Sequence, residues 1–373
     1  MLPTARTLAQ LLVLCLTALG LSGCWDAIPI EERGVVIAIG VDPASGSTLE
    51  RWTFVLPNVT ATASDVSSLA PSQQLFSVDV HAGGWNTAQE ALATRLSRLP
   101  YFGQLEAVVV SDRLPAERVS SIVSDLNAES GIPKSYFVVG AHGSAAELAS
   151  TVWPDEVVPR YWLKSYFSCG TCHALDLRRY GWQWWADHEA GGRSPFIPVF
   201  QLVHRLPKLA GVDVYPSVGP PVRMPDGAAQ GLALLLGRAR ALSLTTALAG
   251  RSIQVQRLTV RAKTDAAWTP TGVQVDVHMA ALGVFATSLP VKDPEIFLHA
   301  AQSPVARALL GRSEEAVGFA NRTHTDPFGW NERAALTARE PMGWPNTLPV
   351  TLESLAAHLT VHVQLKEQGV YGE

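Results

Sequence analysis

The sequence predicts a mixed α/β and α+β protein of more than one domain, in which an α/β N-terminal region precedes a C-terminal domain of antiparallel sheet plus helices. Three observations lead to this prediction. The chain has 373 residues, about two and a half times the usual ~150-residue domain. Strand and helix patterns alternate along its first half. Long stretches of two-residue alternation, typical of half-buried strands, characterise its second half.

The composition allows a packed core and excludes several classes of protein. Hydrophobic residues make up 47% of the chain and charged residues 17%, which excludes a disordered chain, a collagen or a coiled coil as a global description. Lysine and arginine number 29 against 33 acidic residues, a formal net charge of -4, and no run of like charge concentrates it. We therefore expect no nucleic-acid partner.

Residues 1–23 are predicted to be a lipoprotein signal peptide. Arg6 supplies a positive start, and the 19 residues of 7–25 carry no charge and are rich in leucine. Leu21-Ser22-Gly23 then precedes Cys24, the lipobox order of bacterial lipoproteins. We expect cleavage before Cys24 and lipidation of its thiol, with palmitate-type chains holding the ectodomain to membrane lipid. The alternative is an uncleaved anchor, because 19 uncharged residues could just span a bilayer.

Two cysteines remain after this processing. Cys15 leaves with the signal peptide and Cys24 is used for lipidation, so only Cys169 and Cys172 are left. A single pair in an exported protein indicates a possible local disulfide. The mature chain has 28 basic and 33 acidic residues, and its net charge is therefore -5.

The α/β prediction for residues 24–205, the expected N-terminal domain, depends on the order of their strands and helices. Buried strands are expected at 34–41, 52–56, 75–82, 105–110 and 136–141. Helices are expected at 88–99, 115–129 and 144–152. Asn86 or Thr87 is expected to cap the first helix, Pro115 to open the second, and Ser144 to cap the third.

Residues 206–230 contain five prolines and are predicted to be a Pro-rich linker. Residues 231–373 are expected to form the C-terminal domain. Its elements are expected to be paired antiparallel strands at 252–263 and 272–282, helices at 294–310 and 313–321, and a last strand with one buried face at 359–365.

Cys169-Gly170-Thr171-Cys172-His173 has the spacing of a c-type haem attachment site, in which two thioethers and an imidazole hold the haem. A long, strand-rich chain is unlike the small helical haem domains, so we favour a disulfide between Cys169 and Cys172 or two free thiols. A redox pair and a metal site that includes His188 are further alternatives. We expect no cofactor and no metal.

No other pattern points to catalysis, and we expect no catalytic residues and no enzyme. The chain has no Gly-x-Ser-x-Gly elbow, phosphate loop or dinucleotide fingerprint. Asp187-His188-Glu189 could approach a metal, but adjacent residues of a helix do not share a face, so we interpret them as a solvated polar turn. The tryptophans within 182–185 are expected in the core or at an interface.

Several segments, taken in order, resemble the Ger(x)C family of spore germination lipoproteins. They are Cys24-Trp25-Asp26 after the lipobox, the strand ending in Gly40-Val41-Asp42, Leu99 to Leu105, Ser194 to Pro198, Gly231-Leu232-Ala233, and Thr325 to Gly329. Their order and spacing carry the resemblance, which covers nearly the whole chain.

The resemblance implies a C subunit of a GerA-type nutrient germinant receptor. Such a subunit is non-enzymatic and is expected to be needed for germination through assembly with A-type and B-type membrane subunits. Its expected place is the extracytoplasmic face of the spore inner membrane. Cys24, as the lipidated cysteine, is the functional residue that the family carries over to this chain.

Two rival functions remain. An exported solute-binding lipoprotein would also be anchored and α/β, but it would have two similar lobes around a hinge. An anchored c-type cytochrome would use Cys169, Cys172 and His173 and would show haem absorbance.

Overall fold

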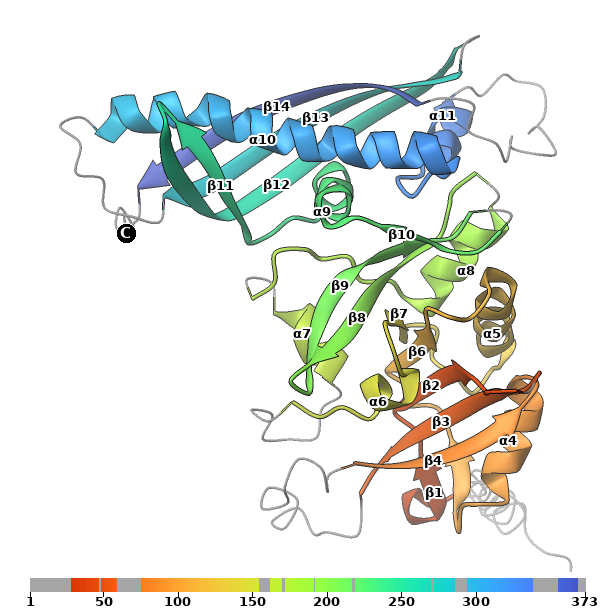
Figure 1. The fold of residues 1–373 in the computed structure, drawn as a ribbon. Coiled ribbons are helices and arrows are strands. Elements are labelled where there is room, and N and C mark those ends of the chain that lie inside the picture. The colour runs from red at the N-terminus through yellow and green to blue at the C-terminus, as the bar shows by residue number, and fades with distance from the viewer. Residues whose placement is uncertain are drawn as a thin grey trace, which may run out of the picture.

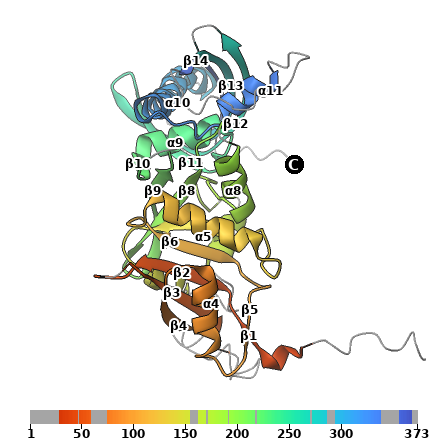
Figure 2. The same cartoon turned by 90° about the vertical axis from the view of Figure 1, so that its right-hand side faces the viewer.

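The computed structural model describes residues 28–337 and 355–367, apart from 47, 59–74, 154–161, 170–171, 191, 217–218, 270–271 and 286–293. The expected signal peptide and Cys24 therefore lie outside the described residues. The molecule is elongated, with an eight-stranded sheet and its helices in the lower part and a four-stranded sheet with its own helices at the upper end (Figure 1). The first described residues lie at the end opposite the four-stranded sheet (Figure 2).

The larger sheet has a parallel centre and antiparallel flanks, in the strand order β10-β9-β8-β7-β6-β2-β3-β4. Its strands are β2 (Ala38–Pro43), β3 (Glu50–Pro57), β4 (Leu75–Ala82), β6 (Ala107–Ser111), β7 (Phe137–Ala141), β8 (Phe196–Val203), β9 (Leu206–Val214) and β10 (Val222–Met224). β2, β6, β7 and β8 pair in parallel, and the outer strands join them antiparallel. Every residue of β6 and β7 is buried, as in strands covered on both faces.

Helices cover both faces of this sheet, so the predicted α/β class is confirmed (Figure 1). One face carries α4 (Trp85–Ala93), α5 (Ala116–Ala128) and α8 (Gly181–Glu189), and the other carries α6 (Ala145–Ala149) and α7 (Trp162–Ser168). The apolar positions of α5 face the sheet with the predicted helical period. The Ser144 hydroxyl accepts the Glu147 backbone N–H and caps α6, as expected.

The first expected strand, 34–41, is divided between two sheets. A short 3-10 helix, η1 (Ile30–Glu32), leads into β1 (Arg33–Val35), which pairs in parallel with β5 (Leu99–Tyr101) in a separate two-stranded sheet. The chain then changes partners: the Val36 N–H donates to Tyr101 and the Ile37 N–H donates to Val55, each at 2.9 Å. β2 begins directly afterwards in the large sheet. A continuous apolar run does not reveal such a change, because both halves are buried.

The first helix also differs from its prediction. α4 begins at Trp85 rather than after the expected caps Asn86 or Thr87, and it ends at Ala93. Trp85 is 2% exposed, and its ring packs edge-on against Phe102 with the centroids 4.9 Å apart. Burial of this large ring, rather than a polar cap, therefore determines where the helix starts.

The Pro-rich segment 206–230, expected to be a linker, holds β9, β10 and the start of α9 (Asp226–Leu235). Its prolines lie where strand hydrogen bonding is not needed. Pro207 is near the start of β9, at a point where β9 has β8 on one side only, and Pro225 is the N-cap position of α9. The proline count was therefore a misleading sign of a linker, since an outer strand tolerates proline.

The four-stranded sheet runs β11-β12-β13-β14. Its strands are β11 (Leu242–Leu248), β12 (Arg251–Thr269), β13 (Gly272–Phe285) and β14 (Leu355–Glu367). β12 and β13 pair antiparallel, as predicted. β11, which was not predicted, pairs antiparallel with β12, whereas β14 runs parallel to β13. Alternating burial in β12 and β13 gives the sheet one face packed on helices and one face in solvent.

The packed face is covered by α9, by the long helix α10 (Pro294–Thr323) and by α11 (Trp330–Thr337). The two helices expected at 294–310 and 313–321 are one continuous helix, which includes Pro304. The buried Ser313 hydroxyl donates to the Leu309 carbonyl at 3.0 Å within the same helix, so it does not start a new one. In the described part of the chain, no helix has an apolar stretch long enough to cross a bilayer.

α9 and α10 cross in close contact at Gly231, the first residue of the Gly231-Leu232-Ala233 segment. A Cβ at this position would overlap the Arg312 carbonyl oxygen and lie 2.9 Å from the Ala316 Cβ. The neighbouring Leu232 and Ala233 are fully buried. Glycine is thus required by the backbone-to-backbone approach of the two helices.

The buried residue Asp326 connects the helix cover of the four-stranded sheet to the segment before β8 of the large sheet. Asp326 accepts the N–H groups of Phe328, Gly329 and Asn331 at 2.8 to 3.1 Å, and this cap opens α11. The Asp326 N–H in turn donates to the Ser194 hydroxyl at 2.9 Å, just before β8. Burial raises the pKa of Asp326 to about 6, although the three backbone N–H groups oppose that rise.

Candidate functional site

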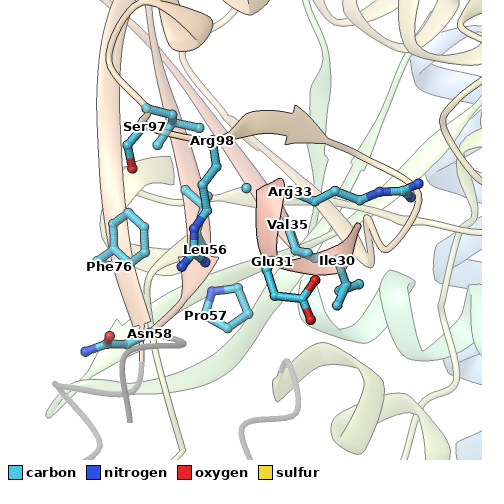
Figure 3. Close-up of a pocket in the computed structure, with 12 residues that line it drawn as sticks. Ile30, Glu31, Arg33, Val35, Leu56, Pro57, Asn58, Phe76, Ser97 and Arg98 are labelled. Carbon is cyan, nitrogen blue, oxygen red and sulfur yellow. The ribbon is translucent and has the colours of Figure 1, made fainter. Parts of the chain in front are cut away.

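A pocket of about 410 Å³ lies at the end of the molecule where the described chain begins (Figure 3). Its walls come from η1 and β1, from the end of β3 and the start of β4, and from the loop between α4 and β5. Ile30, Leu56 and Phe76 provide apolar wall, while Glu31 and Arg98 bring charge. Its volume is that of a small-molecule site.

The two arginines of this pocket are held differently. The Arg33 Nε donates to the Ile28 carbonyl at 3.1 Å, and its guanidinium lies 4.5 Å from the centroid of the Tyr101 ring. Arg98 forms no hydrogen bond or ion pair with any described residue, and its side chain runs toward Leu56 (Figure 3). Arg98 is therefore a cation beside an apolar wall that is available to an anion.

Exposed apolar side chains belong to this pocket or to residues near its lining in the chain. Ile30 is 65% exposed, Leu99 55%, Phe76 43% and Ile28 42%. Leu99 follows Arg98 and pairs in register with Arg33. A single exposed apolar side chain is ordinary, but a group of them around one pocket is typical of an interaction surface.

A second polar cluster lies where the parallel strands end, the usual ligand edge of such a sheet. Asp42, at the end of β2, is 2% exposed and binds the Arg51 guanidinium at 2.8 Å. It also accepts the N–H groups of Ala145 and Ala146, at 2.9 and 3.0 Å. Asp42 thus anchors the first turn of α6, and its oxygens are used by the protein itself.

Beside it, Asp112 and His142 follow β6 and β7 and lie 2.6 Å apart. Arg223 of β10 bridges Asp112, at 3.2 Å, and the buried Asp213. Burial raises the pKa of Asp213, and the hydrogen bond and charge of Arg223 oppose that rise. This network ties β10 and β9 to the centre of the sheet, so its carboxylates have structural partners.

Cys169 and Cys172 are joined by a disulfide, with their Cα atoms 5.4 Å apart, at the end of α7. His173 stacks on Tyr166 with ring centroids 3.6 Å apart, and burial lowers its pKa. The disulfide uses both sulfurs that a pair of haem thioethers would need. The geometry therefore favours the disulfide among the interpretations left open by the sequence.

His188 does not join that pair. It lies on α8, on the other face of the large sheet from α7, and its Nε2 is 2.8 Å from the Ser120 hydroxyl. Its neighbour Asp187 is 6% exposed and pairs with Arg179 at 3.2 Å and with Arg193 at 3.0 Å. The interpretation of this segment as a solvated polar turn was wrong, because Asp187 is a buried ion-pair centre.

The three tryptophans of α8 divide between the core and the surface. Trp184 is buried in the core, whereas Trp182 and Trp185 are 50% and 42% exposed. Across the described ranges, no group of three or more His, Cys, Asp or Glu side chains is arranged to hold a metal ion.

Sequence reasoning missed the pocket. Its charged residues Glu31 and Arg98 are far apart in the chain and belong to no motif. The available signal was a short segment, Ile28 to Arg33, which combines two isoleucines with charged residues close behind the lipobox. The predicted lipidation site itself, Cys24, lies outside the described residues.

Comparison with known proteins gives three findings. Residues 26–202 match the family described as the spore germination protein N-terminal domain. A stretch of 142 residues is 27% identical to spore germination protein A3 of Bacillus subtilis (strain 168), and it spans 37% of this chain and 37% of that relative. The fold is similar to the crystal structure of the GerBC protein, with a TM-score of 0.54 and 10% identity over 88% of this chain and 96% of that one.

These findings agree with the ordered segments found in the sequence. The matched residues 26–202 include the two-stranded sheet and the large sheet from β2 to β8, but not its outer strands β9 and β10. The likeness to GerBC extends over both sheets and concerns the fold alone. Residues 26–202 are thus similar to the N-terminal domain of spore germination proteins, in agreement with the resemblance of the sequence to the Ger(x)C family.

Proposed function

We propose that this protein is a lipid-anchored, non-enzymatic subunit of a spore nutrient germinant receptor. It assembles with A-type and B-type membrane subunits on the extracytoplasmic face of the spore inner membrane. The observation that carries the proposal is the match of residues 26–202 to the spore germination N-terminal domain. The similarity to spore germination protein A3 supports it over about a third of each chain.

Anchoring through Cys24 is supported by the lipobox and by the position of the described chain. Ile28, the first described residue, is four residues beyond Cys24. The red segment in which the described chain begins lies at one end of an elongated molecule (Figure 2). A lipid at Cys24 would hold that end at the membrane and leave the four-stranded sheet far from it. Two or three acyl chains give stable anchoring where one does not.

Action by assembly rather than by turnover is supported by the polar clusters. Asp42, Asp112, Asp213 and Asp187 each face an arginine in the structure, and Asp42 also caps α6. The pocket brings together Glu31 and Arg98 with apolar side chains, which suits binding rather than nucleophilic attack. A membrane-bound subunit also gains effective concentration beside its partners without a large soluble interface.

The rival functions have less support. The solute-binding alternative requires two similar lobes, whereas the two sheets here differ in strand number, strand order and helix cover. The cytochrome alternative requires two thioether sulfurs, and these are joined to each other. A haem Soret band in the purified protein would support the cytochrome alternative.

Deletion of the gene in a strain whose other receptor operons are removed tests the proposal. We expect spores that form normally and respond poorly to the cognate nutrient, but germinate with agents that bypass receptors. The Cys24→Ala variant should behave like the deletion, while Cys169→Ser with Cys172→Ser should still germinate. Germination of the deletion strain at the parental rate would refute the receptor role.

A further inference from the structure

We propose that the pocket end of the molecule docks on the membrane surface, with Arg98 at the lipid phosphates and Ile30, Phe76 and Leu99 in the interfacial layer. The inference rests on the proposed lipid anchoring and adds an orientation to it. It assigns the pocket to a lipid surface instead of a soluble ligand. The receptor subunit then keeps one orientation on the membrane and does not rotate freely about its lipid tether.

The length of the tether is the first argument. Four peptide steps separate Cys24 from Ile28, so an acylated Cys24 holds Ile28 within ~14 Å of the bilayer. The charge of a lipid surface reaches ~8–10 Å into physiological salt solution. The Ile28 carbonyl accepts a hydrogen bond from the Arg33 side chain, and Arg33 belongs to β1, which forms a wall of the pocket. The pocket is thereby held beside the lipid headgroups.

The chemistry of the pocket is the second argument. Arg98 has no hydrogen-bond or ion-pair partner among the described residues, and its long side chain lies against the apolar wall. Arginine in this setting reaches a phosphate while its methylene groups stay on apolar surface. The pocket's Glu31 gives the site mixed charge, so binding needs the apolar contacts as well as the cation.

The exposed apolar side chains are the third argument. Ile30 and Phe76 line the pocket, and Leu99 follows the lining residue Arg98 in the chain. The three side chains are from 43% to 65% exposed and belong to three different elements. Isoleucine, leucine and phenylalanine are the side chains that enter the boundary between headgroups and acyl chains when a basic group lies beside them. One lipid surface thus covers apolar groups that would otherwise stay in water.

The test uses the acylated full-length protein reconstituted into vesicles. With Cys24 acylated and Cys169 bonded to Cys172, an introduced cysteine is the only free thiol. A fluorophore at Ser97→Cys reports on the pocket, and one at Ala280→Cys, exposed on β13 at the far end, is the control. The vesicles contain equal parts of phosphatidylcholine and phosphatidylglycerol, with brominated phosphatidylcholine as the quencher.

We expect the label at 97 to be quenched and blue-shifted, and the label at 280 to be unaffected. Arg98→Gln should lower the ratio of docked to undocked protein about fivefold, the effect of removing one basic group near an anionic surface. Arg261→Gln, which removes an exposed charge from the four-stranded sheet, should leave it unchanged. Glu32→Cys, exposed on η1 next to the lining residue Glu31, gives a second reporter if the label at 97 disturbs the pocket.

Two failures are distinguishable. Intact mass decides first whether Cys24 carries acyl chains, and an unmodified Cys24 refutes the anchoring and this inference with it. An acylated protein whose labels at 97 and 32 resist quenching as fully as the label at 280 refutes the docking alone. The docking is also refuted if Arg98→Gln leaves the quenching on phosphatidylglycerol vesicles unchanged, because in the proposal the Arg98 guanidinium binds the lipid phosphate.

Discussion

Replacing Gly231 with alanine should destabilise the protein, even though alanine is the better helix former. Gly231 lies in α9 where that helix meets α10. The added Cβ would overlap the Arg312 carbonyl oxygen and lie 2.7 Å from its carbonyl carbon. Ordinary contacts of this kind begin near ~3.5 Å, so the helices would have to separate by roughly 1 Å. Backbone atoms of a packed helix cannot rotate away as a side chain can.

The size of the effect follows from two opposing contributions. Alanine in place of glycine favours a helix by up to about 1 kcal/mol. Overpacking a buried contact costs about 1–3 kcal/mol, and occasionally more when backbone must shift. Leu232 and Ala233, both fully buried, would lose contact as the helices part. We expect Gly231→Ala to lower the free energy of unfolding by about 2 kcal/mol.

Gly227→Ala is the matched control, one turn earlier on the same helix. Its Cβ would meet only the carboxylate end of Glu315, a side chain that can rotate away. We expect this variant to be neutral or slightly more stable. Urea unfolding followed by circular dichroism measures both variants, and the difference between them should be about 2–3 kcal/mol. Equal stability, or a less stable Gly227→Ala, would refute the argument from close approach.

Three other changes test separate parts of the structure. Burial raises the pKa of Asp326 from 3.8 to about 6, so the folded protein binds this proton more tightly than the unfolded chain does. Protonation of Asp326 therefore contributes roughly 3 kcal/mol to the free energy of unfolding below about pH 4, and this contribution is lost as the pH rises through 6. Unfolding curves at pH 4 and pH 7 should therefore show a smaller loss of stability for Asp326→Asn than for the parent protein. Gly329→Ala, at φ +75 with a guanidinium beside its Cβ position, should cost more than Gly250→Ala, at φ +77 with nothing near; thermal unfolding that ranks them equally would contradict this. Replacing Cys169 and Cys172 with serine should lower stability by at most ~2 kcal/mol, since a short closed loop removes little entropy from the unfolded chain. A larger loss in urea unfolding would show that the disulfide does more than close its loop.

Local patterns in the sequence were sufficient for much of the fold. The helical period of α5, the Ser144 cap and the alternation of β12 and β13 are each determined within a few residues, and all three were predicted. The class of fold follows from such elements taken in order. Their order along the chain also supported the family resemblance.

The missed features depend on residues far apart in the chain. β1 separates from β2 because Arg33 pairs with Leu99, and a run of apolar residues cannot show a change of partner. β9 and β10 were read as linker because proline suits both an outer strand and a loop. The pocket was missed for the same reason, because the pairing of β1 with β5 is what brings Arg98 next to η1 and β1. A site assembled from single residues on separate elements leaves no spaced motif to find.

The parallel pairing of β14 with β13 has a consequence for the making of the protein. β14 follows the whole of α10 and α11 in the chain, yet it lies along the full length of β13. Until residues 355–367 have been synthesised, β13 presents a long unpaired edge, and α10 lacks the Val363 and Leu365 side chains, which belong to the same hydrophobic core. A stop codon before β14 would therefore leave a chain in which β13 has an unpaired edge that can pair with other chains. Such chains are prone to aggregate before they fold, so a truncation that spares every residue of the large sheet can still abolish the folded protein.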